Sequence, residues 1–584
     1  MLPYIHAPFE YVAGLVGAGP DELKLIFSIL LSYPLAGLLK RVPDAKPAYK
    51  NLFITSYVHR FPKELLGDGD GEVELTFALL PLSVGIFYLV GLFDLWVGLR
   101  TILIASGGAY GIAYYLRGSP YMPWVGFVFL MVHMSTNQLA RQFADAPSAI
   151  DITGAQMVLV MKLSAFCWNV ADGLLPEDQM SDFQKDRALK ELPDLLDYAG
   201  YVFFFPALLA GPAMDFNEYR RWLDTSMFEV PSTVDPAKKP PTRKKRRIPR
   251  SATPAMWKLA TGIVWILAFL NFSGWYNVEA LLDDNFMDFG FARRVWIMYM
   301  TNLTARMKYY GVWCMTEGAC ILTGMGYNGF DPVTGKVSWD RLRNIYPWGV
   351  ESAQNTRAYL ENWNMKTNLW LRHYVYLRVT PRGKKPGFRA SLATFTTSAV
   401  WHGFYPGYYL AFILASFIQT IAKNFRRYFR PFFIDPLTQQ PTPLKPYYDF
   451  FSFLATQLAF TFTTTPFIVL GFADSVKIWA RVYFYGVVGV ALSMAFFASP
   501  AKPLLKKKIE ERASAAGGQL RKSASTDSLT AGGSNEQEAL VGPGLSSDVN
   551  RDFGEMMGEA RLTWAERQKL MKAKGMKVKG GKVQ

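Results

Sequence analysis

The sequence has 584 residues, of which 50% are hydrophobic, 15% are aromatic and only 19% are charged. Ordinary soluble domains carry roughly 25% charged residues, so this composition excludes a soluble multidomain enzyme and, for most of the chain, intrinsic disorder. The formal net charge is +16, and the many Tyr, Phe and Trp residues are available for the interfacial belts of a membrane protein.

Hydrophobic windows recur along most of the chain. Crossing about 30 Å of hydrocarbon takes roughly 20 mostly apolar residues, so we expect an all-α polytopic membrane protein with about eleven membrane helices. Several windows contain Gly, Pro or charged residues, so some helices should be broken, tilted or re-entrant. The windows are Leu25–Leu39, Leu75–Leu99 (the clearest), Thr101–Leu116, Tyr121–Leu139, Ile152–Val170, Tyr198–Met214, Met256–Trp275, Val295–Gly324, Leu392–Ile421, Phe450–Phe472 and Ile478–Phe497.

Three hydrophilic regions interrupt this pattern. Residues 237–250 are strongly basic and contain no acidic residue, which predicts a cytoplasmic loop. Residues 327–389 are polar but rich in Trp, Tyr and Asn, which indicates ordered structure at the membrane face. Residues 501–584 have the composition of a disordered basic cytoplasmic tail. The membrane domain is therefore expected to occupy residues 1–500.

Charge leaves part of the topology open. The basic stretches Arg378–Arg389 and Arg426–Arg430 flank the window Leu392–Ile421. A single crossing cannot place both stretches on the same side of the membrane.

His402 is a candidate catalytic base. It lies in the segment Trp401–Tyr409, just inside a long apolar window. Imidazole titrates near neutrality, and burial keeps it in the neutral form that accepts a proton. An ionisable group at membrane depth is a functional candidate. The alternatives are a core histidine that bonds a carbonyl and, for Gly403 and Gly407, a small-residue packing face.

The second candidate segment is Glu361–Arg372, which contains Asn364 and Asn368. If the segment is helical, the two residues share one face. Uncharged amide donors suit a site that stabilises an oxyanion beside a base. The alternative is an Asn-rich helix that packs at the membrane interface. His373 lies among Trp, Tyr and Arg residues and is interpreted as structural.

Other chemistries lack a signature in the sequence. There is no P-loop, no pair of His and carboxylate residues with helix-face metal spacing, and no Gly-x-Ser-x-Gly elbow. Cys167, Cys314 and Cys320 lie in apolar stretches at spacings that fit neither a disulfide framework nor a zinc site.

With these motifs in order, the sequence resembles the membrane-bound O-acyltransferase family, and within it the fungal-type lysophospholipid acyltransferase branch. Trp401–Tyr409 is similar to the family's histidine motif and Trp363–Trp370 to its asparagine motif, with Asn364 at the functional asparagine position. Segments Leu195–Arg221 and Tyr327–Arg357 are also similar to this branch. The likeness extends from about Leu75 to Phe497.

The resemblance implies transfer of a fatty acyl group from acyl-CoA to the free hydroxyl of a lysophospholipid, in a chamber between the helices. His402 would act as general base, and Asn364 would orient the reactants or donate to the oxyanion. Acyl-CoA would be a cosubstrate, with no tightly bound cofactor, no metal and no nucleic-acid partner. The implied location is the endoplasmic reticulum membrane, in contact with membrane lipids.

The expected substrate-binding residues surround the two motifs. They are Arg357, Trp363, Asn368, Trp370, Arg372, Trp401, Tyr405 and Tyr408. The basic mouth for CoA could include Arg341, Arg343, Arg357, Lys366 and Arg372, although such side chains also extend to lipid headgroups. Lys366 is assigned no catalytic role.

Three alternatives remain open at this stage. The same site could acylate a sterol, diacylglycerol or protein. The chain could be a transporter in which His402 relays protons and Asn364 binds solute. A covalent route through Cys314 or Cys320 is also conceivable, although buried thiols are usually inert.

Overall fold

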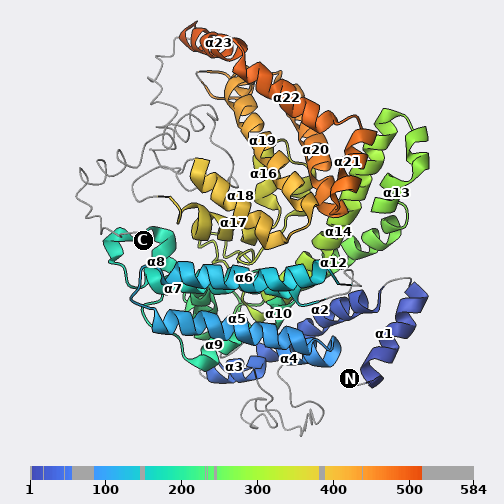
Figure 1. Cartoon of the computed structure of the whole chain (residues 1–584). Coiled ribbons are helices and arrows are strands. Elements are labelled where there is room, and N and C mark those ends of the chain that lie inside the picture. Colours follow the sequence, from blue (N-terminus) through green and yellow to red (C-terminus); the bar gives the residue numbers. More distant parts are fainter. Residues whose placement is uncertain are drawn as a thin grey trace, which may run out of the picture.

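The computed structural model describes residues 3–515 apart from residues 17–18, 45–46, 56–83, 145–150, 231, 233, 243–245, 381–387 and 437. This part of the chain is built from helices, and its only β pairing consists of isolated bridges. In Figure 1 the N-terminal helices form the lower part of the molecule, and the helices that follow residue 356 form the upper part.

The N-terminal part contains both short and long helices. They are α1 (Pro3–Val16), α2 (Pro20–Leu39), α3 (Pro47–Thr55), α4 (Val84–Ile86), the π-helix η2 (Phe87–Leu92), α5 (Trp96–Tyr115), α6 (Met122–Gln142), α7 (Thr153–Asp172), η3 (Glu177–Gln179), α8 (Asp182–Arg187), α9 (Leu195–Val202), α10 (Phe205–Leu208), α11 (Phe216–Leu223), η4 (Ser226–Phe228) and η5 (Pro236–Lys238).

The remaining elements carry both candidate motifs. They are α12 (Ala252–Ser273), α13 (Val278–Leu282), η6 (Asp284–Asp288), α14 (Phe291–Thr323), α15 (Pro347–Glu351), α16 (Thr356–Asn362), α17 (Met365–Leu371), the π-helix η7 (Arg372–Tyr376), α18 (Phe388–His402), α19 (Pro406–Tyr428), η8 (Arg430–Phe433), α20 (Lys445–Val469), α21 (Phe472–Arg481), α22 (Tyr485–Ala498) and α23 (Ala501–Ala515).

Helix α14 links the two parts of the molecule. It has 33 residues and so extends for about 50 Å. It packs along α12 and also contacts α2 and α10 of the lower part and α20 of the upper part.

Helix α7 is the scaffold on which the candidate site is built. It packs against α5 and α6 and contacts α17 and η7. In its most apolar window 78% of the residues are buried, against 11% for α12. Helix α7 is therefore enclosed by protein, whereas α12 exposes apolar side chains such as Trp257 and Leu267, as a lipid-facing helix does.

Four helices in the described residues are long and apolar enough to cross a membrane, or five if the bent pair of α21 and α22 forms one span. They are Pro20–Leu39, Thr153–Asp172, Ala252–Leu282 and Lys445–Val469. The chain is thus a multi-helix protein with several candidate spans, and the expected number of about eleven is not confirmed.

Several expected windows are not single helices, among them Tyr198–Met214, which contains parts of α9 and α10, and Ile478–Phe497, which contains parts of α21 and α22. Leu75–Leu99 lies partly outside the described residues, and its described part is interrupted between η2 and α5, where Asp94 adopts a left-handed conformation with φ 58°. Leu392–Ile421 is divided between α18 and α19 by a turn at Gly403–Tyr405. Because the window is not one straight crossing, the basic stretches at its two ends do not have to lie on opposite sides of the membrane.

The disordered tail was expected from residue 501 onward, but its first described residues are helical. Residues 501–515 form α23, which has no buried residue and is held at Arg512, whose guanidinium donates to the carbonyl of Pro431. Lys and Glu residues four apart support a helix on an exposed face. Residues 516–584 lie outside the described residues.

Candidate active site

The asparagine motif forms a turn between two short helices. Helix α16 ends at Asn362 and α17 begins at Met365, and Asn364 between them has φ 43° and ψ 53°. Asn tolerates this left-handed conformation better than most residues. The condition under which Asn364 and Asn368 would share one helical face is therefore not met, because Asn364 lies just before α17.

Asn368 closes the end of α16. Its side-chain amide donates to the carbonyls of Leu360 (2.7 Å) and Trp363 (2.8 Å). These bonds satisfy carbonyl groups that a helix end leaves without partners. The expected contact of Asn368 with substrate stays a prediction, and both of its donors are already occupied by the protein.

The Asn364 side chain is held at its oxygen. Its Oδ1 accepts a hydrogen bond from the hydroxyl of Thr367 at 2.8 Å. Among the described residues, its Nδ2 makes no hydrogen bond. The arrangement fixes the orientation of the amide and leaves an N–H donor available.

Two tryptophans dock both motifs on α7. Trp370 of α17 donates from Nε1 to Ser164 Oγ at 2.9 Å, and Trp401 of α18 donates from Nε1 to the carbonyl of Met157 at 3.0 Å. The two indole rings lie 6.1 Å apart, and both residues are buried. Segments about 30 residues apart in the sequence thus meet on one helix.

His402 is the last residue of α18, at the edge of an aromatic cluster. Its ring centroid lies 4.7 Å from that of Trp401, 4.8 Å from Phe467, 5.3 Å from Phe412 and 5.7 Å from Tyr408. Within the described part of the chain, no hydrogen bond reaches the imidazole. An apolar shell of this kind favours the uncharged ring.

The two glycines of the histidine motif have different functions in the fold. Gly403 has φ 123°, a conformation that favours glycine, and it ends α18 directly after His402. Gly407 lies against α20, where an added Cβ would be 2.0 Å from the carbonyl oxygen of Pro466. Gly407 is therefore a packing residue, as one of the two interpretations of the motif held.

The other expected binding residues lie around these segments. The ring centroid of Trp363 lies 5.3 Å from that of Trp313 on α14. The ring centroids of Tyr405 and Tyr408 are 6.1 Å apart. Arg357 forms an ion pair with Glu361 at 2.7 Å. Arg372 begins η7, next to His373, whose ring stacks on Phe183 at 3.5 Å.

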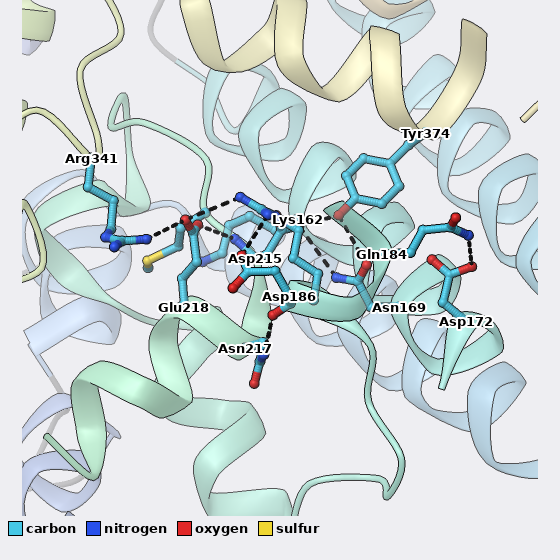
Figure 2. A network of polar contacts seen from close by, with 12 residues as sticks. Lys162, Asn169, Asp172, Gln184, Asp186, Asp215, Asn217, Glu218, Arg341 and Tyr374 are labelled. Carbon is cyan, nitrogen blue, oxygen red and sulfur yellow. Dashed lines mark hydrogen bonds and ion pairs between the residues drawn. The ribbon is translucent and has the colours of Figure 1, made fainter. Parts of the chain in front are cut away.

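A buried charge cluster contacts η7, the helix that follows α17, through Tyr374 (Figure 2). Glu218 of α11 pairs with Arg341 at 3.3 Å and Arg187 at 3.6 Å, and Asp215 pairs with Arg187 at 2.6 Å. The Tyr374 hydroxyl of η7 donates to Asp215 at 2.7 Å. Burial disfavours the charged carboxylate of Glu218, but the cations Lys366, Arg187 and Arg341 outweigh it and lower its pKa to about 2.

Sequence reasoning did not assign a role to this cluster. Asp215 and Glu218 lie three residues apart at the start of an amphipathic helix, which is an ordinary capping pattern. The sequence gives no sign that Arg187 and Arg341, from distant segments, supply the countercharges. Arg341 and Arg343 were both expected at the basic mouth for CoA. Arg341 is paired with Glu218 within the protein, and Nη1 of Arg343 lies 3.8 Å from Oδ2 of Asp340.

No group of three or more His, Cys, Asp or Glu residues with suitable geometry occurs in the described ranges. Cys167, Cys314 and Cys320 are buried free thiols.

Comparison with known sequence families identifies the class of this protein. Residues 145–465, more than half of the chain and including both motifs, match the MBOAT, membrane-bound O-acyltransferase family. This chain belongs to the membrane-bound O-acyltransferase family. Membership agrees with the expectation from the motifs, and it makes the chain an acyltransferase.

Relatives within the family extend over most of the chain. A protein named lysophospholipid acyltransferase from Schizosaccharomyces pombe is 40% identical over 508 residues, which are 87% of this chain and 92% of the relative. One with the same name from Saccharomyces cerevisiae is 38% identical over 82% of this chain and 75% of the relative. Human membrane-bound glycerophospholipid O-acyltransferase 2 is 28% identical over 67% of this chain and 72% of the relative.

Proposed function

We propose that this acyltransferase moves a fatty acyl group from acyl-CoA to the free glycerol hydroxyl of a lysophospholipid. The names of the yeast relatives support the acceptor, since they cover more than four fifths of this chain. The structural observation that carries the site is the contact of Trp370 with Trp401 on α7, which brings the asparagine and histidine motifs together.

The chemistry requires one acyl transfer and the movement of one proton, by way of a base, from the hydroxyl to the departing CoA thiolate. His402 takes the proton of the lysophospholipid hydroxyl while the oxygen attacks the thioester carbonyl. The amide Nδ2 of Asn364 donates to the oxyanion that forms on the carbonyl oxygen. The carbon–sulfur bond then breaks, the CoA thiolate takes the proton from His402, and the products are CoA and a diacyl phospholipid.

The environments of the two groups suit these roles. The aromatic rings around His402 favour the neutral imidazole that a base requires. The Thr367 hydroxyl fixes the oxygen of the Asn364 amide, so that its N–H donor has a defined direction. A donor that is already oriented stabilises an oxyanion without reorganisation in the transition state.

The substrate pocket and the topology belong to the same proposal. Trp363, Tyr405 and Tyr408 line the pocket for the acyl and lysophospholipid chains. Arg357 and Arg372 face the phosphates of CoA. About eleven membrane helices enclose the chamber, some of them shorter or more polar than the usual criterion for a span. Residues 1–500 form this domain in the endoplasmic reticulum membrane, with residues 237–250 and the tail in the cytoplasm.

Acceptor competition in purified enzyme tests the proposal. The protein in nanodiscs receives acyl-CoA together with lysophosphatidylcholine, a sterol and diacylglycerol in equal amounts, and CoA release and each acylated product are measured. Preferential acylation of the lysophospholipid is expected. Preferential acylation of another acceptor would contradict the substrate, and absence of CoA release with every acceptor would contradict acyl transfer.

A further inference from the structure

Three helices in the described part of the chain begin after an asparagine, and one of them is capped differently. Asn277 and Asn355 have extended backbones, and their side chains accept hydrogen bonds from Ala280 and Ala358 in the first turns of α13 and α16. This is the usual N-cap arrangement. Asn364 stands at the same position of α17, but its left-handed backbone leaves its side chain making no cap hydrogen bond.

Asn344, twenty residues earlier, caps α17 instead. Its carbonyl oxygen accepts from the backbone N–H of Met365 at 2.8 Å, and its side-chain Oδ1 accepts from the N–H of Lys366 at 3.0 Å. Helix N-termini leave such N–H groups without intrahelical partners. A residue from outside the helix therefore supplies the acceptors that the local asparagine supplies in α13 and α16.

The segment Asn344–Tyr346 also bonds the chain just before the turn that contains Trp363 and Asn364. The backbone N–H of Tyr346 donates to the carbonyl of Asn362 at 3.0 Å. Asn344 and Tyr346 thus bracket Trp363 and Asn364. Asn344 is only 4% exposed and the next residue, Ile345, is fully buried, whereas the side chain of Tyr346 is exposed. The Asn344 side of the bracket therefore lies in the protein interior.

The buried charge cluster anchors this bracket. Arg341, three residues before Asn344, donates from Nε to the carbonyl of Tyr327 at 2.6 Å and pairs with Glu218. Lys366 in the first turn of α17 is also attracted by Glu218. Glu218 thus interacts both with a residue close to Asn344 and with a residue of α17, and this fixes the position of Asn344 relative to α17.

We propose that Asn344 is a positioning residue for Asn364. By capping α17 from outside, it allows Asn364 to keep a left-handed backbone and frees the Asn364 amide to face the reacting carbonyl. Asn344 does not itself contact substrate. The inference rests on the proposed role of Asn364 in acyl transfer, and it assigns a function to a residue outside both motifs.

The test compares variants of Asn344 in the full-length enzyme in nanodiscs. Asn344→Ala removes the acceptor for Lys366 and keeps the backbone bond to Met365. We expect kcat to fall about 10- to 100-fold, because small displacements of a catalytic group cost rates of this order, while KM for both substrates stays unchanged. Asn344→Asp retains an acceptor at the same place and should keep most of the activity.

Two further variants separate positioning from general stability. Asn277→Ala removes an ordinary cap from α13 and should lower the unfolding temperature with little change in kcat. Asn344→Gln moves the amide outward by one methylene group, and it should lose kcat as Asn344→Ala does; it also serves as the test if the alanine variant does not fold. Wild-type kcat in folded Asn344→Ala or Asn344→Gln would overturn the proposal, as would Asn344→Asp as slow as the alanine variant.

Asn364→Gly distinguishes this inference from the proposed function. Glycine accepts the left-handed backbone, so the variant removes only the side chain. If Asn364→Gly retains full kcat, the catalytic role of Asn364 fails, and the inference about Asn344 fails with it. If Asn364→Gly is nearly inactive while folded Asn344→Ala is fully active, only the positioning role fails.

Discussion

The two motif segments are held in place by different kinds of contact. Around His402 the contacts are aromatic, from α18, α19 and α20, with no hydrogen bond to the ring in the described residues. Around Asn364 the contacts are polar, with the backbone bracketed by Asn344 and Tyr346 and the side-chain oxygen held by Thr367.

The difference corresponds to what each group has to do. A base must start uncharged, and an apolar shell favours that form. An oxyanion donor must point in one direction before the charge develops, which hydrogen bonds secure better than apolar packing does. Helix α7 joins the two environments because it accepts a hydrogen bond from a tryptophan of each motif.

The largest effect is expected from His402→Ala. Loss of a general base should lower the rate of acyl transfer by about 10² to 10⁴-fold, measured as labelled phospholipid formed from acyl-CoA and lysophosphatidylcholine. His133→Ala is the matched control, since its Nδ1 lies 3.3 Å from Gln156 on α7 and it takes no part in the proposed reaction. Equal activity of both variants would remove the assignment of the base.

Asn364→Gly should have the next largest effect. Removing one oxyanion donor typically costs about 10² to 10³ in kcat, and glycine accommodates the φ of 43° at this position. Single-turnover CoA release measures the chemical step. A variant that raises KM and leaves kcat unchanged would instead assign Asn364 to substrate binding.

Glu218→Gln tests whether the buried charge cluster stabilises the fold. Removing one partner of a buried charge pair costs about 3 kcal/mol, so thermal unfolding in detergent should occur at a clearly lower temperature. Glu177→Gln is the control, because its pair with Lys190 is exposed and surface pairs contribute little. Equal shifts in the two variants would show that the cluster does not stabilise the fold.

The same carboxylate predicts a pH dependence. The pKa of Glu218 is lowered from 4.5 to about 2 in the folded protein. A lowered pKa contributes stability that is present above pH 4.5 and is lost as the pH falls toward 2. As the pH falls from 4.5 to 2, the unfolding temperature of the wild type should fall further than that of Glu218→Gln. An equal fall in both proteins would contradict this prediction.

The smallest effect is expected from Cys314→Ala combined with Cys320→Ala. Both thiols are buried and free, and the proposed mechanism forms no acyl-enzyme. The double variant should retain its kcat, measured under the same assay as the histidine variant. Loss of activity in folded protein, together with an acylated wild-type cysteine, would favour the covalent route.

The sequence was sufficient to predict the motifs and the helical class, because both depend on local residues. Trp401–Tyr409 and Trp363–Trp370 are recognisable as strings, and the family match covers both. The break between α18 and α19 also has a local signal, since Gly403 and Pro406 flank it.

Long-range contacts could not be predicted in this way. The capping of α17 by Asn344 joins residues 22 positions apart, and the cluster around Glu218 draws charges from four segments. Neither follows from periodicity, because the pairing is decided by how the helices pack. The expected number of about eleven spans is not confirmed by the length and apolar composition of the described helices, and helices enclosed by protein need not be uniformly apolar.

The most direct test of the account is the structure of the enzyme in nanodiscs with a ketone analogue of acyl-CoA, in which a methylene group separates the sulfur from the carbonyl, together with a lysophospholipid. The account predicts the ketone oxygen within about 3.2 Å of Asn364 Nδ2 and the lysophospholipid hydroxyl within the same reach of the His402 ring. An analogue whose carbonyl lies away from both side chains would contradict it.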